Sequence, residues 1–191
     1  MVKVRQDHPL DESGSVDLNA WLERVRTDVN IQVSREAQEQ VIIKNDVWAE
    51  HGSNSYRTGL EMAEILAGLG LDQDALVAAI LYRAVREKKI ALQQVRESFG
   101  QSVAYLVDGV LQMAAIGAVL HPTPHSVLGQ SQGQLDNVRK MLVTMIEDVR
   151  VVLIKLAERT CAIRTVKHGD RVRRYRVARE VFDVYAPLAH R

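Results

Sequence analysis

Apolar residues recur at helical spacing along most of the chain, and no window shows the strict alternation typical of a half-buried strand. The strongest apolar run lies within residues 148–164 and comprises Val149, Val151, Val152, Leu153, Ile154, Leu156 and Ala157. A helix that is apolar on most of its sides is typically buried at the centre of a fold. The pattern therefore predicts an all-α fold, an array of about 8 to 10 helices around this central helix.

The other predicted helices follow from capping residues and apolar faces. Asp17 is expected to cap a helix over residues 18–29, and Ser34 one over about 35–50, which the sequence HGSNS (51–55) then breaks. Gly68 and Gly70 predict a glycine C-cap for the next helix. The remaining helices are predicted over residues 58–69, 72–87, 93–99, 102–113, 134–147 and 171–188.

Two segments lack the helical pattern. Residues 1–16 are polar and contain Pro9 and Gly14, which predicts a flexible N-terminal arm. Residues 117–133 are dense in Gly, Pro, Ser and Gln, which predicts a mobile loop. We therefore expect one helical domain over residues 17–191 behind a short arm.

Composition places the chain among ordinary soluble globular domains. Its 191 residues are 47% hydrophobic and 26% charged, enough for one sizeable core. The single cysteine, Cys161, excludes an internal disulfide, and no apolar run approaches the roughly 18 residues of a membrane span. The first residues lack the apolar core of a signal peptide, so we expect a cytoplasmic protein without a membrane partner.

The charge is unevenly distributed. A formal net charge of +1 argues against wholesale nucleic-acid binding, yet residues 164–191 hold eight Lys and Arg against three Asp and Glu. Arg173, Arg174 and Arg176 form a basic run that predicts a solvated helix face, with contact to phosphates as the alternative.

Few residues look suited to chemistry. His121 and His125 have the spacing of two metal ligands on a helix, but the prolines between them exclude that helix, and we expect solvated loop histidines. Cys161 is expected to be a packing residue, because no histidine is near it in sequence. Glu158 stands out, since a carboxylate on the buried central helix needs a partner or a metal.

Four strings resemble the amino-terminal domain of the RelA/SpoT family, the long (p)ppGpp synthetases and hydrolases. They are SYRTGLEMAEIL, DALVAAILYRAVRE, NVRKMLVTMIEDVRVVLIKLAERTCAIRT and VYAPLAHR, and the likeness covers about residues 45–191. The resemblance implies an HD-domain-like helical array, with a C-terminal helix leading to a synthetase domain that is absent here.

In hydrolytic members of the family, a His, a His–Asp pair and a distant Asp hold a manganese ion that activates water. The matching positions here are Gly59, Tyr82, Arg83 and Glu158. Gly59 offers no donor, Tyr82 is a poor ligand near neutral pH, and Arg83 brings a permanent positive charge. The resemblance therefore implies that no metal and no other cofactor is bound.

Other positions of the family's hydrolase site also differ. The Glu–Asp pair that assists catalysis corresponds to Arg86 and Glu87, and the family's HN string corresponds to Cys161 and Ala162. The arginine that stacks on guanine in hydrolases falls at Glu50, so the nucleotide site is expected to be lost as well.

This pattern resembles the RelA branch, whose amino-terminal domain is an inactive pseudo-hydrolase. The resemblance implies a non-enzymatic regulatory domain of a GTP diphosphokinase that makes (p)ppGpp from ATP and GTP or GDP in the stringent response. The expected partners are its own synthetase domain and, through parts absent here, the ribosome with uncharged tRNA.

Two alternatives stay open. The old pocket can retain a guanine nucleotide without catalysis, since Arg57, Arg83 and Arg86 attract phosphates. A phosphohydrolase with a rearranged metal site would instead need Glu158 together with carboxylates such as Glu61 and Glu64.

The missing cation leads to a structural prediction. We expect Arg83 to pair with Glu158 as a strut across the old metal site, because a guanidinium can replace the charge of the metal and satisfy the carboxylate.

Overall fold

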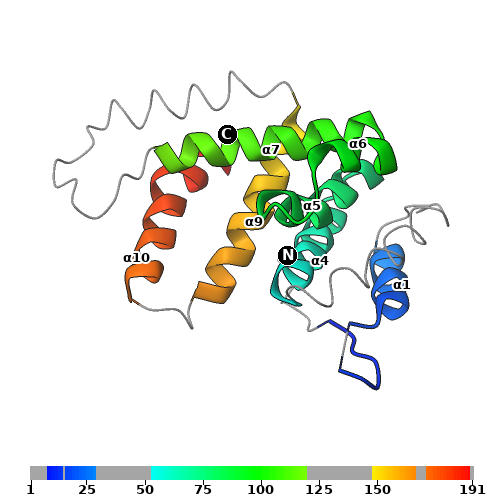
Figure 1. Cartoon of the computed structure of the whole chain (residues 1–191). Helices are drawn as coiled ribbons and strands as arrows, with labels where there is room; N and C mark the ends of the chain where they lie inside the picture. Colours follow the sequence, from blue (N-terminus) through cyan, green and yellow to red (C-terminus); the bar gives the residue numbers. More distant parts are fainter. Residues whose placement is uncertain (1–7, 15, 29–52, 120–147, 167–170, 190–191) are drawn as a thin grey trace, which may run out of the picture.

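The helix predicted to be central lies at the centre of the structure. In the computed structural model, which describes residues 8–14, 16–28, 53–119, 148–166 and 171–189, α9 (Val149–Val166) crosses behind α5 and contacts α4, α5, α7 and α10 (Figure 1). The inward side of α9 buries Val151, Ile154, Ala157 and Cys161. Its first residue, Val149, is exposed, so the apolar run is not buried over its whole length.

Helices α4 (Ser53–Gly68) and α5 (Gln73–Arg86) pack side by side against α9. Gly70 adopts a φ of +76°, and the Leu71 amide donates to the Leu66 carbonyl, which confirms the predicted glycine C-cap. The Asp72 carboxylate caps α5 by accepting a hydrogen bond from the Ala75 amide at 3.0 Å. The predicted break over residues 51–55 was wrong at its end, because α4 already begins at Ser53.

Helices α6 (Leu92–Phe99) and α7 (Gln101–Val119) follow, joined at Gly100 with a φ of +90°. Because α7 continues to Val119, the first three residues of the predicted loop 117–133 are helical, and the prediction was wrong there. Residues 120–133 lie outside the described part of the chain, as do the predicted helices over 35–50 and 134–147 and the residues His121, His125 and Glu50.

The amino-terminal segment lies against α4. Asp17 caps α1 (Leu18–Asp28) as predicted, with its carboxylate 3.0 Å from the Ala20 amide. Ahead of it, the His8 ring lies 3.1 Å from the Arg57 carbonyl, and Arg57 donates a 3.3 Å hydrogen bond to the Gly14 carbonyl. Residues 8–14 of the predicted flexible arm are thus bonded to the domain itself.

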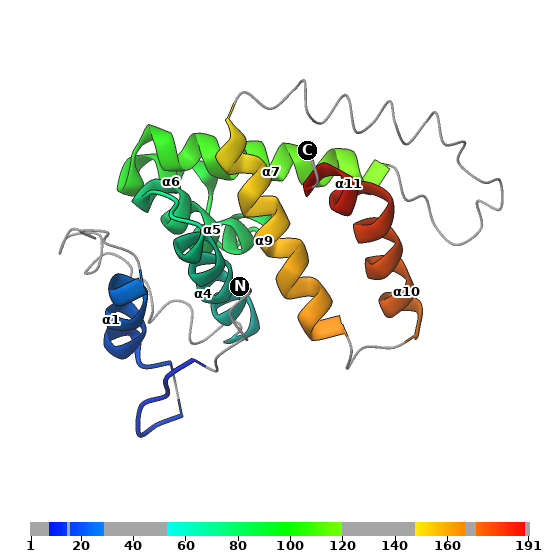
Figure 2. The same cartoon turned by 180° about the vertical axis from the view of Figure 1, so that it is seen from behind.

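The described C-terminal residues 171–189 are helical throughout, but the number of residues per turn changes along them. α10 (Arg171–Glu180) passes into a π-helical segment, η1 (Val181–Tyr185), and then into α11 (Ala186–Ala189) (Figure 2). Pro187 has no N–H for the Asp183 carbonyl four residues earlier, and its ring would clash with that carbonyl in an α-helix. The wider π turn, in which the Ala186 amide donates to Val181, lets the chain stay helical and buries Tyr185.

The described residues confirm the all-α prediction. They contain one isolated β-bridge, Leu10 to Val16, and no helix among them is long and apolar enough to cross a bilayer. The core joins α1, α4, α5, α6, α7 and α9 through the largely buried side chains of Trp21, Leu60, Met62, Leu66, Tyr82, Val95, Leu106, Val107 and Ile154.

Candidate functional site

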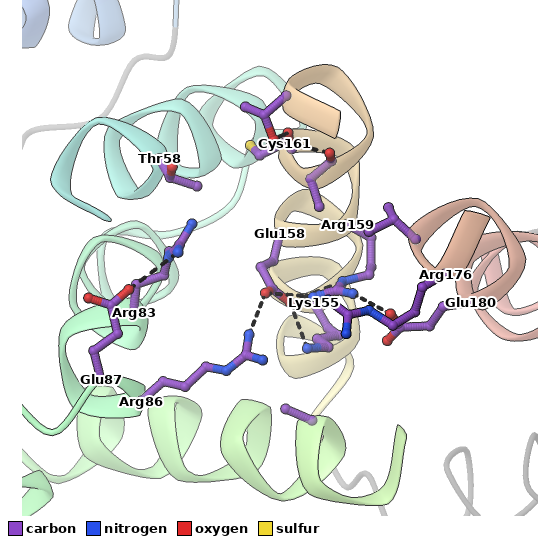
Figure 3. A pocket seen from close by; sticks show the side chains of 14 residues that line it. Thr58, Arg83, Arg86, Glu87, Lys155, Glu158, Arg159, Cys161, Arg176 and Glu180 are labelled. Carbon is purple, nitrogen blue, oxygen red and sulfur yellow. Dashed lines mark hydrogen bonds and ion pairs between the residues drawn. The ribbon is translucent and has the colours of Figure 1, made fainter. Parts of the chain in front are cut away.

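The Glu158 carboxylate lies at the centre of a cluster of cations. Its Oε1 accepts hydrogen bonds from Arg86 Nη1 at 2.8 Å and Arg159 Nη2 at 2.7 Å. Its Oε2 accepts from Lys155 Nζ at 2.6 Å and from Arg159 Nε at 3.2 Å. Figure 3 shows Arg86 reaching this carboxylate from α5, whereas Lys155 and Arg159 belong to α9 itself. The buried carboxylate therefore has three cationic partners and no free oxygen.

The cluster controls the protonation of its members. Burial alone would raise the pKa of Glu158, but Lys155 and Arg159 outweigh it and lower the pKa to about 2. Burial lowers the pKa of Lys155 from 10.5 to about 8, against the opposing attraction of Glu158. The pKa of Glu158 falls because three cations surround the carboxylate. The pKa of Lys155 falls because the attraction of one anion does not offset burial and the repulsion of two neighbouring guanidinium groups. Glu158 is therefore ionised near neutral pH, and its negative charge holds Lys155.

Two tyrosines enclose Lys155. Its Nζ lies 5.6 Å from the centre of the Tyr82 ring and 6.0 Å from that of Tyr185, within the range of cation–π contacts. Tyr82 Oη lies 3.4 Å from the same Nζ. Burial and the Glu158 charge raise the pKa of Tyr82 above its usual value, so its hydroxyl stays protonated near neutral pH. Tyr82 is therefore a packing group of the cluster.

The predicted strut was assigned to the wrong arginine. Arg83 donates to Glu87 at 3.2 Å, within α5, and the partner of Glu158 from α5 is Arg86 (Figure 3). Glu87 also pairs with Lys89 at 2.7 Å. Arg86 lies almost one turn after Arg83, so it leaves the helix in a different direction and reaches the carboxylate that Arg83 does not.

Gly59 of α4 lies close to the backbone of α5. A Cβ built on Gly59 would lie 2.8 Å from the Ile80 carbonyl oxygen and 3.0 Å from the Ile80 Cα. These are backbone atoms, which cannot move aside as a side chain can. The residues present therefore do not fit the manganese ion of the hydrolases, since one ligand position has no room for a side chain and Glu158 is fully bonded.

The other candidate carboxylates are also engaged. Glu61 is buried and accepts a 2.9 Å hydrogen bond from Arg164 Nη1. Glu64 pairs with Arg24 and lies 3.6 Å from the His8 ring. Among the described residues, no group of three or more His, Cys, Asp or Glu could hold a metal ion.

A cavity of about 580 Å³ opens beside the Glu158 cluster, with walls from α4, α5, α7, α9 and α10. It brings together the predicted site positions Arg83, Arg86, Glu87, Glu158 and Ala162. Gly59, Tyr82 and Arg57 do not line it.

Sequence reasoning missed the roles of Lys155, Arg159 and Glu180. Lys155 and Glu158 are three residues apart on one helix, a spacing at which side chains meet, so this partner was detectable. Arg159 also pairs with Glu180 of α10 at 2.7 Å, a contact between distant segments that no local pattern indicates.

The sequence is similar to known proteins over its whole length. The family model of the HD domain matches residues 38–191. The chain is 38% identical over 192 residues to the GTP pyrophosphokinase of Photobacterium angustum and 36% over 194 residues to that of Escherichia coli K12, covering 100% of this chain and 25% of each relative. It is 38% identical over 130 residues to the bifunctional (p)ppGpp synthase/hydrolase SpoT of Escherichia coli K12, covering 68% of this chain and 17% of that relative.

The chain spans about a quarter of the length of the curated GTP pyrophosphokinases it matches. The all-helical fold, the matching family model and these relatives all indicate the same family. The chain belongs to the HD-domain family and is an HD domain of the RelA/SpoT family.

Proposed function

We propose that this chain is a catalytically inactive, regulatory HD domain of a RelA-type GTP diphosphokinase. The observation that carries the proposal is the bonding of Glu158, whose two oxygens accept hydrogen bonds from Arg86, Lys155 and Arg159. The cluster as a whole repels a divalent metal, because its three cations outnumber its single carboxylate and its net charge is positive.

The packing at Gly59 supports the same proposal independently of charge. In the hydrolases the matching position carries a histidine ligand, whereas here any side chain would meet the Ile80 backbone. Recovery of a metal site would therefore require α4 and α5 to move apart, and not only an exchange of ligands.

The activity of the parent is part of the proposal. Relatives at 36% and 38% identity are named GTP pyrophosphokinase and are about four times as long as this chain. We infer that the parent makes (p)ppGpp from ATP and GTP or GDP, and that this activity resides in its other domains. This domain then acts by contact with the synthetase domain.

The outer face of α10 and η1 is suited to that contact. Val172, Tyr175 and Phe182 are exposed there, Phe182 by 77% of its surface. Exposed apolar groups clustered on one helix face commonly mark an interaction surface. Arg179, which pairs with Asp183 at 3.2 Å, adds a charged edge to this face.

The test of inactivity uses the 191-residue chain with Mn²⁺ and ppGpp. We expect no manganese retained after gel filtration in its presence, and no release of pyrophosphate above a protein-free blank. The hydrolase domain of the bifunctional relative is the positive control under the same conditions. Turnover by this chain would instead favour a phosphohydrolase with a rearranged metal site.

The test of regulation uses the full-length parent. Phe182→Ser should change its rate of (p)ppGpp synthesis, because a polar group replaces an apolar contact with the synthetase domain. Tyr105→Ser, an exposed aromatic position on α7, is the matched control. Equal changes of the synthesis rate in the two variants, or no change in either, would contradict a regulatory contact at α10 and η1.

A further inference from the structure

The described part of the amino-terminal arm closes on itself and is bonded to α4 (blue in Figure 2). Near its start, His8 Nε2 lies 3.1 Å from the Arg57 carbonyl oxygen. Near its end, Arg57 Nη2 donates a 3.3 Å hydrogen bond to the Gly14 carbonyl. The Asp17 amide donates to the Pro9 carbonyl at 2.8 Å and so closes the loop beside His8. The contact of His8 with α4 therefore holds the start of this loop in place.

Both nitrogens of the His8 ring face oxygen atoms that accept hydrogen bonds. The His8 side chain is 10% exposed, and its Nδ1 lies 3.6 Å from Glu64 Oε1. This Nδ1 is buried and makes no hydrogen bond with the residues that the structure describes. Burial alone would raise the pKa of Glu64, but His8 and Arg24 outweigh it and lower the pKa, so the carboxylate is ionised near neutral pH. An ionised carboxylate and a backbone carbonyl can only accept.

A neutral His8 ring cannot satisfy both contacts. Neutral imidazole has one N–H, which the Arg57 carbonyl requires on Nε2. The lone pair of Nδ1 would then face the Glu64 carboxylate, and two acceptors would repel each other. A second proton, placed on Nδ1, turns this nitrogen into a donor and puts a positive charge beside the carboxylate. The docked arm therefore favours the charged form of the ring.

The other charged groups around this contact limit its strength. Arg24 of α1 pairs with the same Glu64 carboxylate, so it also repels a charged His8. The Asp17 carboxylate is engaged as the cap of α1, where it accepts from the Ala20 amide at 3.0 Å. Glu64 is thus the carboxylate that faces the ring, and it is shared by two cations from different segments. We expect a modest effect of the ring charge for this reason.

We propose that His8 is a pH-sensitive clasp, which holds the amino-terminal arm on α4 when its ring is charged and releases the arm when its ring is neutral. Histidine changes its charge between pH 5 and 8, a range in which Glu64 stays ionised. Because docking favours the proton-bound ring, docking weakens as the pH rises through this range. The clasp does not depend on the cavity beside Glu158 or on the proposed loss of hydrolysis.

Hydrogen exchange of the Asp17 amide in the 191-residue chain tests the clasp, because this amide donates to the carbonyl of the residue after His8. We expect its protection, corrected for the intrinsic exchange rate, to be about fivefold greater at pH 5.5 than at pH 8, as for a partly exposed ion pair. The amide of Val107, a buried residue of α7, reports unfolding of the whole domain. Equal protection of Asp17 at the two pH values, or a change that only follows Val107, would overturn the proposal.

Two variants remove the pH response by different routes. His8→Gln does not titrate, yet its side-chain amide can still donate to the Arg57 carbonyl in place of Nε2. Glu64→Gln removes the carboxylate that favours the charged ring. Both variants should show the same protection of Asp17 at pH 5.5 and pH 8, with Val107 correcting for any change in global stability. A fivefold pH effect that persists in either variant would show that another group is responsible.

The position of the ring can also be followed directly. Nuclear Overhauser contacts between the His8 ring protons and the side-chain protons of Glu64 should be strong at pH 5.5 and weaker at pH 8. Contacts of equal strength at both pH values would contradict release of the arm. The assay of ppGpp hydrolysis with Mn²⁺ is independent of this result, so failure of the clasp and failure of the proposed function are distinguishable.

Discussion

Arg86 of α5 donates a hydrogen bond of 2.8 Å to Glu158 of α9. The bond joins residues that are 72 positions apart in sequence. Lys155 and Arg159 hold the same carboxylate from within α9. Glu158 thus belongs to a charge cluster that ties two helices together.

The members of this cluster should differ in what their loss costs. Glu158→Gln leaves the buried Lys155 without an anion and leaves Arg159 with Glu180 as its anion, and we expect the free energy of unfolding to fall by about 3–5 kcal/mol. Arg86→Gln removes a half-exposed cation whose partner keeps two others, and should cost about 1 kcal/mol or less. Urea denaturation followed by circular dichroism measures both. Similar losses for the two variants would contradict the expectation that Glu158 contributes more to stability than Arg86 does.

The close approach at Gly59 leads to a second prediction. Gly59→Ala places a Cβ about 2.8 Å from the Ile80 carbonyl oxygen, so α4 and α5 must separate. We expect a loss of about 1–3 kcal/mol, the usual cost of overpacking a core. Gly68→Ala in the same helix is the control, because nothing lies within 4 Å of its added Cβ. Thermal unfolding that ranks the two variants in the opposite order would refute the close packing.

Local signals in the sequence were sufficient for much of the fold. The Asp72 cap, the Asp17 cap and the left-handed Gly70 were all predictable, because each depends on residues within one turn of the helix end. The helix predicted over residues 171–188 continues past Pro187, but it does so through a π turn that places Tyr185 against Lys155 of α9. That packing lies beyond any local pattern.

The site was predictable only in part. That a carboxylate at position 158 needs a partner follows from burial alone, and Lys155 lies within its helical reach. The choice between Arg83 and Arg86 depends on how α5 is rotated about its axis, which the contact of Gly59 with Ile80 helps to set. The sequence shows both arginines, but it does not show how α5 is rotated about its axis.

The pair between Glu61 of α4 and Arg164 of α9 allows a third prediction. Its N–O distance is 2.9 Å, and the Glu61 side chain is 6% exposed. Arg164→Ala leaves this carboxylate buried with one cation fewer, and should cost on the order of 2 kcal/mol in unfolding free energy. Arg179→Ala breaks an exposed pair with Asp183 and should cost about 0.5 kcal/mol or less. Chemical denaturation of both variants should therefore separate them clearly, and equal costs would contradict the burial of Glu61.

The last prediction concerns the pH dependence that Lys155 confers. Its pKa in the folded state is about 8, against 10.5 for an unperturbed lysine, because burial disfavours the ammonium. Between these values the unfolded chain binds more protons than the folded one, so the free energy of unfolding rises with pH. The contribution is complete above the unfolded value and is lost as the pH falls through the folded value.

Lys155→Met isolates this contribution, because methionine fills a similar volume and does not titrate. The unfolding free energy of the wild type minus that of the variant should increase by about 2 kcal/mol from pH 8 to pH 10. Subtraction removes the titration of groups common to both proteins, including Tyr82 and Tyr185. Urea denaturation at half-unit steps of pH measures the difference. A flat or falling difference over this range would show that Lys155 keeps its proton on folding and that Glu158 outweighs its burial.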